Sequence, residues 1–289
     1  MKKVLELPLR LFCIIAGSIS VFAIPYLFVM GDSVTFTLDP LWDFMKLRLM
    51  ALMELTEPNS LNLLDQLNAA ESYRYTMAIL AISLAVVIIS GIFWAIIVQM
   101  APRIIRQALR KVLDFFEVVP DLLIIFLFQF VIIALYKETG LKILQLYGMF
   151  GHKPIFVPIV TISFLPSLML MQFLIKELGQ EESKDYVQYN IAKGLAPFRI
   201  LLVHMVRNIF PLLVIQLRTI LWILLSNQYL LEYMFELPGI TKTFKIAFNQ
   251  GDFLVLMILL LVFTMPLLII EAISYLVFRF YNGKEAANL

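Results

Sequence analysis

The stretch Asp185–Asn208, DYVQYNIAKGLAPFRILLVHMVRN, is a polar segment between long apolar runs. Ser183 or Asp185 is placed to cap a short helix over residues 186–193. Gly194 follows where many helices end on a left-handed residue, a conformation that glycine adopts without the cost of a Cβ atom. The pattern therefore predicts a short helix that ends in a tight turn outside the bilayer.

A second helix is expected directly after this turn. Pro197 suits its first position, because a proline's missing N–H has no intrahelical partner there. Its apolar face is expected to comprise Phe198, Leu201, Leu202, Met205 and Ile209, with Arg199, Arg207 and Asn208 largely off that face. The alternative is an ordinary connection between two membrane helices, which needs fewer residues and no matched turn signals.

The composition indicates that the rest of the chain is solvated by lipid. Of 289 residues, 61% are hydrophobic and only 15% are charged, whereas a soluble domain carries about a quarter charged residues. A membrane-spanning helix needs about 20 apolar residues. The sequence predicts an all-α membrane protein with six transmembrane helices, at Leu11–Met30, Thr76–Met100, Pro120–Tyr136, Pro154–Ile175, Ile209–Leu231 and Phe253–Phe278.

The distribution of lysine and arginine sets the expected orientation, because these residues concentrate in cytoplasmic loops. They favour a plasma-membrane protein whose two termini and segment 185–208 lie in the cytoplasm. The expected organisation is an N-terminal transmembrane helix over 1–30, an extracytoplasmic loop with one or two short helices over 31–75, a core of five spans over 76–279 that contains a cytoplasmic loop over 176–208, and a cytoplasmic tail over 280–289.

Four polar residues fall inside the predicted spans, namely Arg218, Asn227, Gln228 and Glu271. Charged groups in a membrane are costly and usually face a bundle interior or a water-filled path. Arg218 and Glu271 fall at comparable depth in the fifth and sixth spans, which permits an ion pair. A structural role for this pair is favoured over a substrate contact, and both interpretations remain open.

Two further features concern the second span and the segment after it. Ala81, Ala85, Ser90 and Gly91 are small enough to permit close helix packing. Residues 101–119 are basic and amphipathic, which predicts a helix at the inner lipid surface or one that extends a membrane helix.

The polar segment resembles the cytoplasmic signature of binding-protein-dependent ABC transporter permeases, with the closest likeness to the oligopeptide/dipeptide/nickel branch. The residues that carry the resemblance are Asp185, Tyr186, Val187, Ala192, Lys193, Gly194, Leu195, His204, Arg207, Asn208 and Pro211. Leu231–Thr241, LEYMFELPGIT, is similar to a later family segment through Glu232, Phe235, Pro238 and Gly239. The sequence departs from the family pattern at Asn190, Ile191 and Thr241.

The resemblance implies a type I importer-like permease bundle with a cytoplasmic coupling helix. The coupling helix would contact a separate ATPase through Asp185, Tyr186, Val187, Ala192, Lys193, Gly194 and Leu195. The implied partners are a second homologous permease, two cytoplasmic ATP-binding subunits, an extracellular or periplasmic substrate-binding protein and the bilayer.

Several functions are excluded or disfavoured by the residues present. The chain has no phosphate-binding loop of the G-x-x-x-x-G-K-[ST] type, so ATP and Mg²⁺ are expected on the partner ATPase and no cofactor on this chain. Cys13 is the single cysteine and His occurs twice, which predicts neither a metal site nor catalytic residues. The net charge of +2 is too small to suggest nucleic-acid binding.

The resemblance favours peptides as the transported substrate, with nickel or metal chelates as the alternative. A membrane scaffold or channel without a motor is the competing class of function, and a membrane enzyme is the least supported.

Overall fold

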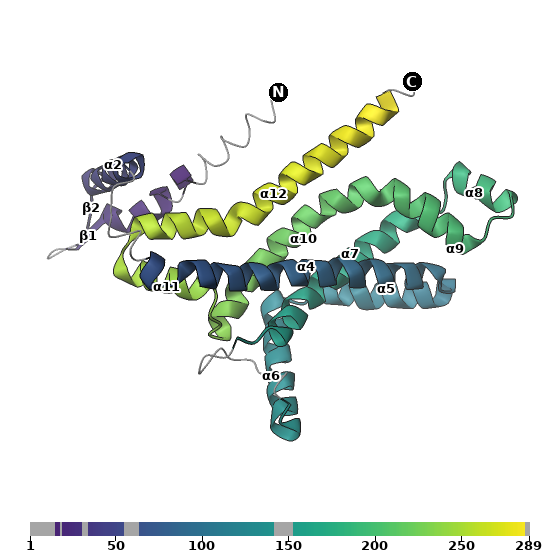
Figure 1. Ribbon diagram of the computed structural model, residues 1–289, viewed down its shortest axis with the longest axis horizontal. Coiled ribbons are helices and arrows are strands. Elements are labelled where there is room, and N and C mark those ends of the chain that lie inside the picture. Colours follow the sequence, from purple (N-terminus) through teal and green to yellow (C-terminus); the bar gives the residue numbers. More distant parts are fainter. Residues whose placement is uncertain (1–14, 18, 31–33, 55–63, 142–152, 287–289) are drawn as a thin grey trace. The chain divides into compact units, whose positions relative to one another are not determined.

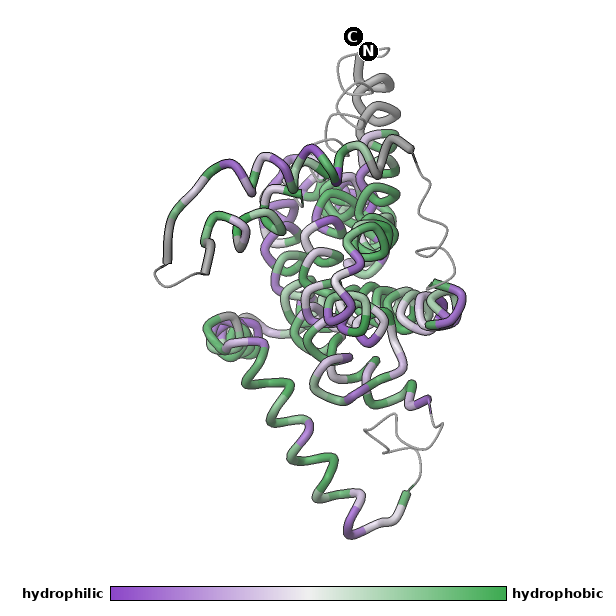
Figure 2. The backbone as a smooth tube through the Cα atoms, turned by 90° about the vertical axis from the view of Figure 1, so that its left-hand side faces the viewer, coloured by the Kyte–Doolittle hydropathy of each residue, from purple (hydrophilic) through white to green (hydrophobic). Residues whose placement is uncertain are grey.

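A computed structural model describes residues 15–17, 19–30, 34–54, 64–141 and 153–286. Among these residues, five helices are long and apolar enough to cross a membrane: Ala69–Met100, Asp121–Thr139, Phe156–Glu181, Pro197–Met234 and Phe253–Val277. They match the second to sixth predicted spans, and Figure 2 shows their predominantly hydrophobic course. The all-α membrane class is confirmed. Of the first predicted span, Leu11–Met30, only residues 11–14 and 18 lie outside the described residues, and residues 15–17 and 19–23 are helical.

The end of that first span differs from the prediction. Ile24–Leu27 form a 3₁₀ turn, η1, and Phe28–Met30 form a short strand, β1. This strand pairs antiparallel with β2, Val34–Phe36. Pro25 removes a backbone donor, and the aromatic and β-branched residues after it favour an extended chain. The prediction of a helix through Met30 was therefore wrong for these residues.

The chain divides into two compact units, and the first comprises residues 1–74 and 239–268. Its described helices are α2 (Asp39–Glu54), α11 (Ile240–Gln250) and the beginning of α12 (Phe253–Ala286). α2 is a helix of the kind expected in the outer loop. Its Phe44 ring meets the Phe253 ring edge-on at 5.8 Å, and the Arg48 guanidinium lies 5.3 Å from the centre of the Phe44 ring.

The second unit comprises residues 75–238 and 269–289. Its elements in chain order are α4 (Ala69–Met100), α5 (Arg103–Val118), α6 (Asp121–Thr139), α7 (Phe156–Glu181), α8 (Asp185–Ala192), α9 (Pro197–Arg199), the π-helical segment η4 (Ile200–Met205), α10 (Val206–Met234) and the later part of α12. α7 is the central helix, since 56% of its most apolar window is buried against 17% for α6. α10 packs along α7 (Figure 1).

Close packing of α4 on α7 depends on a glycine. A Cβ atom on Gly91 would lie 2.9 Å from Cγ of Leu170 on α7, which is nearer than such contacts allow. Beside it, the Ser90 hydroxyl donates a hydrogen bond of 2.9 Å to Ser167. The prediction of close helix packing at small residues is confirmed for Ser90 and Gly91. It is not met at Ala81 and Ala85, which are exposed.

α5 packs along α7. As α5 proceeds from its N-terminus, its contacts with α7 move from the C-terminal end of α7 toward the N-terminal end. The Gln172 side-chain amide donates to Asp114 at 2.9 Å, and the Phe116 and Phe164 rings lie edge-on at 5.7 Å. Because its partners follow α7 in reverse order, α5 runs antiparallel to α7. Neither predicted alternative for residues 101–119, a helix at the inner lipid surface or an extension of a membrane helix, included this packing along α7.

Candidate functional site

The predicted helical hairpin is present at the end of α7, where α8 and α9 project from the second unit (Figure 1). α8 comprises Asp185–Ala192, and Lys184 occupies the N-cap position without a side-chain cap bond. The prediction of a cap from Ser183 or Asp185 was wrong. The Ser183 hydroxyl instead donates to the Gln180 carbonyl at the end of α7, and Asp185 lies in the first turn of α8. There its negative charge complements the helix dipole.

The turn after α8 has the two hydrogen bonds of a Schellman motif. The Gly194 N–H donates to the Ile191 carbonyl at 2.9 Å, and the Leu195 N–H donates to the Asn190 carbonyl at 3.2 Å. Gly194 has a φ of +78°, so the predicted left-handed turn residue is confirmed. The turn is thereby set by backbone conformation, because a Cβ atom on Gly194 would have no other atom within 4 Å.

The second helix begins as expected but presents a different apolar face. Pro197 occupies its first turn. Ile200, Leu201, Met205 and Ile209 are buried, whereas Phe198 and Leu202 are exposed. The prediction assumed α-helical periodicity, but Ile200–Met205 form a π-helical segment. Each π turn takes up more residues than an α turn, which rotates the residues before it away from the expected face.

α8 is anchored to the end of α7 by a buried carboxylate. The side chain of Glu181 accepts hydrogen bonds from the Lys184 ammonium and from the Tyr186 hydroxyl, the latter at 2.5 Å. Burial and then this bond to Glu181 raise the pKa of Tyr186 to about 12, so the hydroxyl remains a donor at physiological pH. Val187, the next residue of α8, is 2% exposed and packs inward. Two of the predicted coupling residues therefore fix α8 in place.

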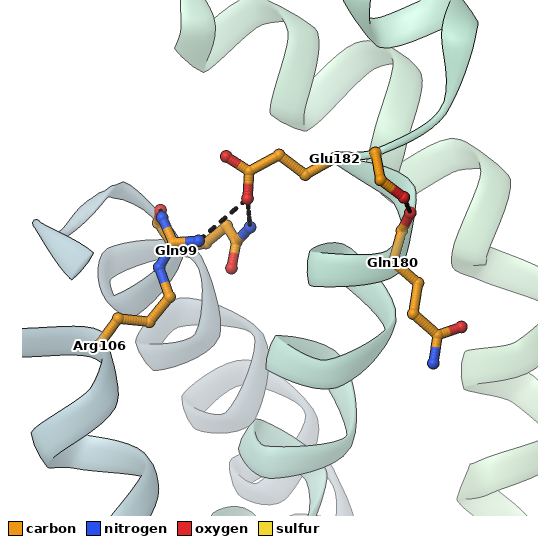
Figure 3. Close-up of polar contacts among 5 residues, drawn as sticks. Gln99, Arg106, Gln180 and Glu182 are labelled. Carbon is orange, nitrogen blue, oxygen red and sulfur yellow. Dashed lines mark hydrogen bonds and ion pairs between the residues drawn. The ribbon is translucent and has the colours of Figure 1, made fainter.

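The neighbouring carboxylate, Glu182, contacts the junction of α4 and α5 (Figure 3). The Gln99 side-chain amide and an Arg106 guanidinium nitrogen each donate to Glu182 Oε2 at 3.0 Å. A second guanidinium nitrogen of Arg106 donates to the Gln99 carbonyl at 2.6 Å. Adjacent residues at the end of α7 thus hold α8 and the α4–α5 junction, respectively.

The outward surface of α8 combines polar and apolar groups. Tyr189 is 61% exposed and Ile191 is 53% exposed. The Lys193 ammonium lies 4.3 Å from the centre of the Tyr189 ring, a cation–π contact. Asp185, Ala192, Lys193 and Gly194 are also exposed, and Leu195 is half-buried. An anchored helix with exposed apolar side chains outside the spans is suited to docking another protein.

The intramembrane polar residues fall into two groups. Arg218 and Glu271 lie 3.3 Å apart, so the structure brings together the two charges paired in the sequence analysis. Asn227 and Gln228 are buried, and the Gln228 amide donates to Glu232 at 2.8 Å. Asn227 and Gln228 therefore lie in the buried interior between the helices of this chain.

Several residues of the site were missed in the sequence analysis. Glu181, Glu182 and Arg106 were not assigned roles, and both glutamates lie in the polar sequence that follows the predicted span ending at Ile175. Their partners are fixed by tertiary packing, for which a single sequence holds no periodic signal. In the described part of the chain, no group of three or more His, Cys, Asp or Glu side chains is placed to hold a metal ion.

These features define a class, a multi-pass helical membrane protein with an anchored helical hairpin between two of its spans. Residues 87–284 match the family described as "Binding-protein-dependent transport system inner membrane component". Because this match covers more than half of the chain, the protein belongs to that family. The prediction of a permease related to the oligopeptide/dipeptide branch of ABC transporters is confirmed, as is its place in the membrane.

Similar proteins include two named dipeptide transport system permease protein DppB. The one from Bacillus subtilis (strain 168) is 28% identical over 101 residues, or 35% of this chain and 33% of that protein. The one from Lactococcus lactis subsp. cremoris (strain MG1363) is 27% identical over 139 residues, or 48% of this chain and 46% of that protein. The matched regions thus span a third to a half of these relatives.

A longer match is found to the metal-staphylopine import system permease protein CntB of Staphylococcus aureus (strain Mu50 / ATCC 700699). It is 20% identical over 214 residues, which covers 74% of this chain and 67% of that protein.

Proposed function

We propose that this chain is the membrane subunit of an ATP-driven importer and that α8 docks a separate cytoplasmic ATPase. The observation that carries this proposal is the exposed apolar pair Tyr189 and Ile191 on a helix that Glu181 fixes to the end of a membrane span. A loop that only connected two spans would have no reason to expose these side chains on an anchored helix. Of the predicted coupling residues, Asp185, Ala192, Lys193, Gly194 and Leu195 would contribute to the docking surface beside Tyr189 and Ile191, while Tyr186 and Val187 would hold α8 in position.

The remaining partners follow from membership in a binding-protein-dependent family. One chain would form half of the pathway with a second, homologous permease, while two ATPase subunits supply ATP and Mg²⁺ and an external binding protein delivers the substrate. Closure of the ATPases would move α8 and so reorient the spans. The two termini and α8 would face the cytoplasm, and this chain would hold no cofactor.

Peptides are the proposed substrate class, supported by the two dipeptide-permease relatives. Metal chelates are the second candidate, supported by the longer match to the metal-staphylopine permease. A direct comparison of uptake of a radiolabelled tripeptide and of a metal chelate by cells with and without this chain would separate them.

The docking proposal is tested by co-purification of the tagged chain from its native host. We expect a protein with a phosphate-binding loop to co-purify with the wild-type chain and to be lost from the Ile191→Asp variant. Ile89→Asn, on the exposed face of α4, is a control variant because it changes an exposed apolar residue within a span. Capture of the same ATPase at equal yield by Ile191→Asp would contradict the proposal.

A further inference from the structure

The exposed face of α10 carries polar and aromatic side chains along the membrane span. Five of them recur every three or four residues and so share one face of the helix. We call this set the α10 stripe, and it consists of Arg218, Trp222, Ser226, Tyr229 and Tyr233. The Arg218 side chain is 48% exposed, and Trp222, Tyr229 and Tyr233 are 54%, 43% and 57% exposed.

Other spans of the same unit expose a different chemistry. The outward residues of α4 include Ile82, Val86, Ile89 and Phe93, and those of α6 include Leu123, Phe126, Leu127 and Phe130. Such faces are suited to lipid chains. A half-exposed guanidinium is not, because a charged side chain in the hydrocarbon region is costly and is found facing a bundle interior or water. The α10 stripe therefore requires a wet or proteinaceous neighbour.

We propose that the α10 stripe lines the water-filled translocation path and that Arg218 receives a carboxylate of the transported solute. Glu271 is 3.3 Å from one guanidinium nitrogen and holds it in place. The guanidinium has five N–H donors, and this contact leaves donors for a second, bidentate carboxylate. The Ser226 and tyrosine hydroxyls can donate hydrogen bonds to amide groups of the solute or accept them, while the aromatic rings can pack against apolar side chains of the solute.

This inference rests on the proposed transport function and narrows its substrate to amide- or amine-containing molecules with a free carboxylate. Both peptides and amino-acid-derived metal chelates have this chemistry. Arg218 acts as the carboxylate-binding residue, and Glu271 is a positioning residue that acts through it.

The first test measures whether the stripe contacts water. Single cysteines are placed in a Cys13→Ser background of the complete transporter in lipid nanodiscs and treated with a membrane-impermeant methanethiosulfonate. We expect Ser226→Cys to react at least tenfold faster than Phe126→Cys on the lipid-type face of α6 and than Leu224→Cys, which replaces a fully buried residue. Equal, slow rates at all three positions would place the stripe against lipid or another protein and overturn the proposal.

The second test measures which substrate group Arg218 recognises. Uptake of a tripeptide with a free C-terminus is compared with uptake of its C-terminal amide, and a metal chelate with free carboxylates forms a third arm. We expect Arg218→Gln to reduce uptake of the free acid at least tenfold more than uptake of the amide, and Arg218→Lys to restore part of the difference. A general structural defect would instead lower both peptides equally, which would contradict carboxylate recognition.

These experiments distinguish peptides from chelates as the solute. They also distinguish failure of the proposed transport function from failure of the path-lining role alone. Selective loss of chelate uptake, with no peptide uptake even in wild type, assigns the carboxylate site to chelates. Failure of the chain to capture an ATPase contradicts the proposed function. Capture and transport combined with an unreactive stripe contradict only the path-lining role of α10.

Discussion

The sharpest test of the docking hairpin is substitution of Gly194 by residues that differ only in their tolerance of the left-handed conformation. Gly194 has a φ of +78°, and a Cβ atom there would have no other atom within 4 Å. Steric overlap with neighbours therefore contributes nothing. The remaining penalty is conformational and amounts to about 1–2 kcal/mol for an ordinary residue, with asparagine penalised less than other residues.

For Gly194→Val this penalty favours opening of the turn by roughly tenfold, since about 1.4 kcal/mol corresponds to a factor of ten in an equilibrium constant. A β-branched residue belongs to the types that tolerate positive φ least well. Opening breaks the bonds from Gly194 to Ile191 and from Leu195 to Asn190, and it frees the C-terminal end of α8. Gly194→Asn retains the conformation and serves as the matched variant.

The assay is substrate-stimulated ATP hydrolysis by the reconstituted transporter, together with thermal unfolding of the spans. We expect Gly194→Val to weaken ATPase docking about tenfold, Gly194→Asn to remain near wild type, and the melting of the spans to be the same in both. Equal defects in the valine and asparagine variants would refute the conformational explanation. Normal coupling in both would remove the turn from the docking mechanism altogether.

Three further predictions concern the contacts around the end of α7 and the packing of α4 on α7. Arg106→Glu and Glu182→Arg should each reduce stimulated ATP hydrolysis, and the double charge swap should recover part of it; no recovery would show that the two side chains do not act as a pair. Tyr186→Phe removes a hydrogen bond to a buried carboxylate and should destabilise α8 by about 1–3 kcal/mol, measured as faster amide hydrogen exchange in α8, with unchanged exchange as the contrary result. Gly91→Ala should lower the melting temperature because its new methyl group overlaps Leu170, at a cost of about 1–3 kcal/mol. If this overlap is the cause, the double variant Gly91→Ala/Leu170→Ala should lose less stability than the sum of the two single variants.

Local signals allowed much of the hairpin to be predicted from sequence. Gly194 and Pro197 act through their own backbone preferences, so a turn and a helix start could be placed without any knowledge of neighbours. The second to sixth spans could likewise be predicted from their apolar runs, because length and hydrophobicity alone identify a spanning helix.

Features that depend on distant neighbours were missed or were wrong. Glu182 binds side chains on Gln99 and Arg106, which lie far away in the chain. No local pattern distinguishes such a glutamate from a solvated one. The extended chain at Phe28–Met30 was hidden within an apolar run whose hydrophobicity suits a strand and a helix alike. The pairing of Arg218 with Glu271 could be suggested only because both charges stand out against lipid.

The π-helical segment Ile200–Met205 has a consequence for the direction in which the hairpin points from α10. A π turn is equivalent to one extra residue in an α-helix, and one residue corresponds to a rotation of about 100° around the axis. The number of residues in this segment therefore sets the rotation of the hairpin about the axis of α10. Deletion of Val203 would turn the hairpin to another bearing while leaving every side chain of α8 intact. Under the proposed docking, this one inserted residue determines the direction in which α8 faces its partner.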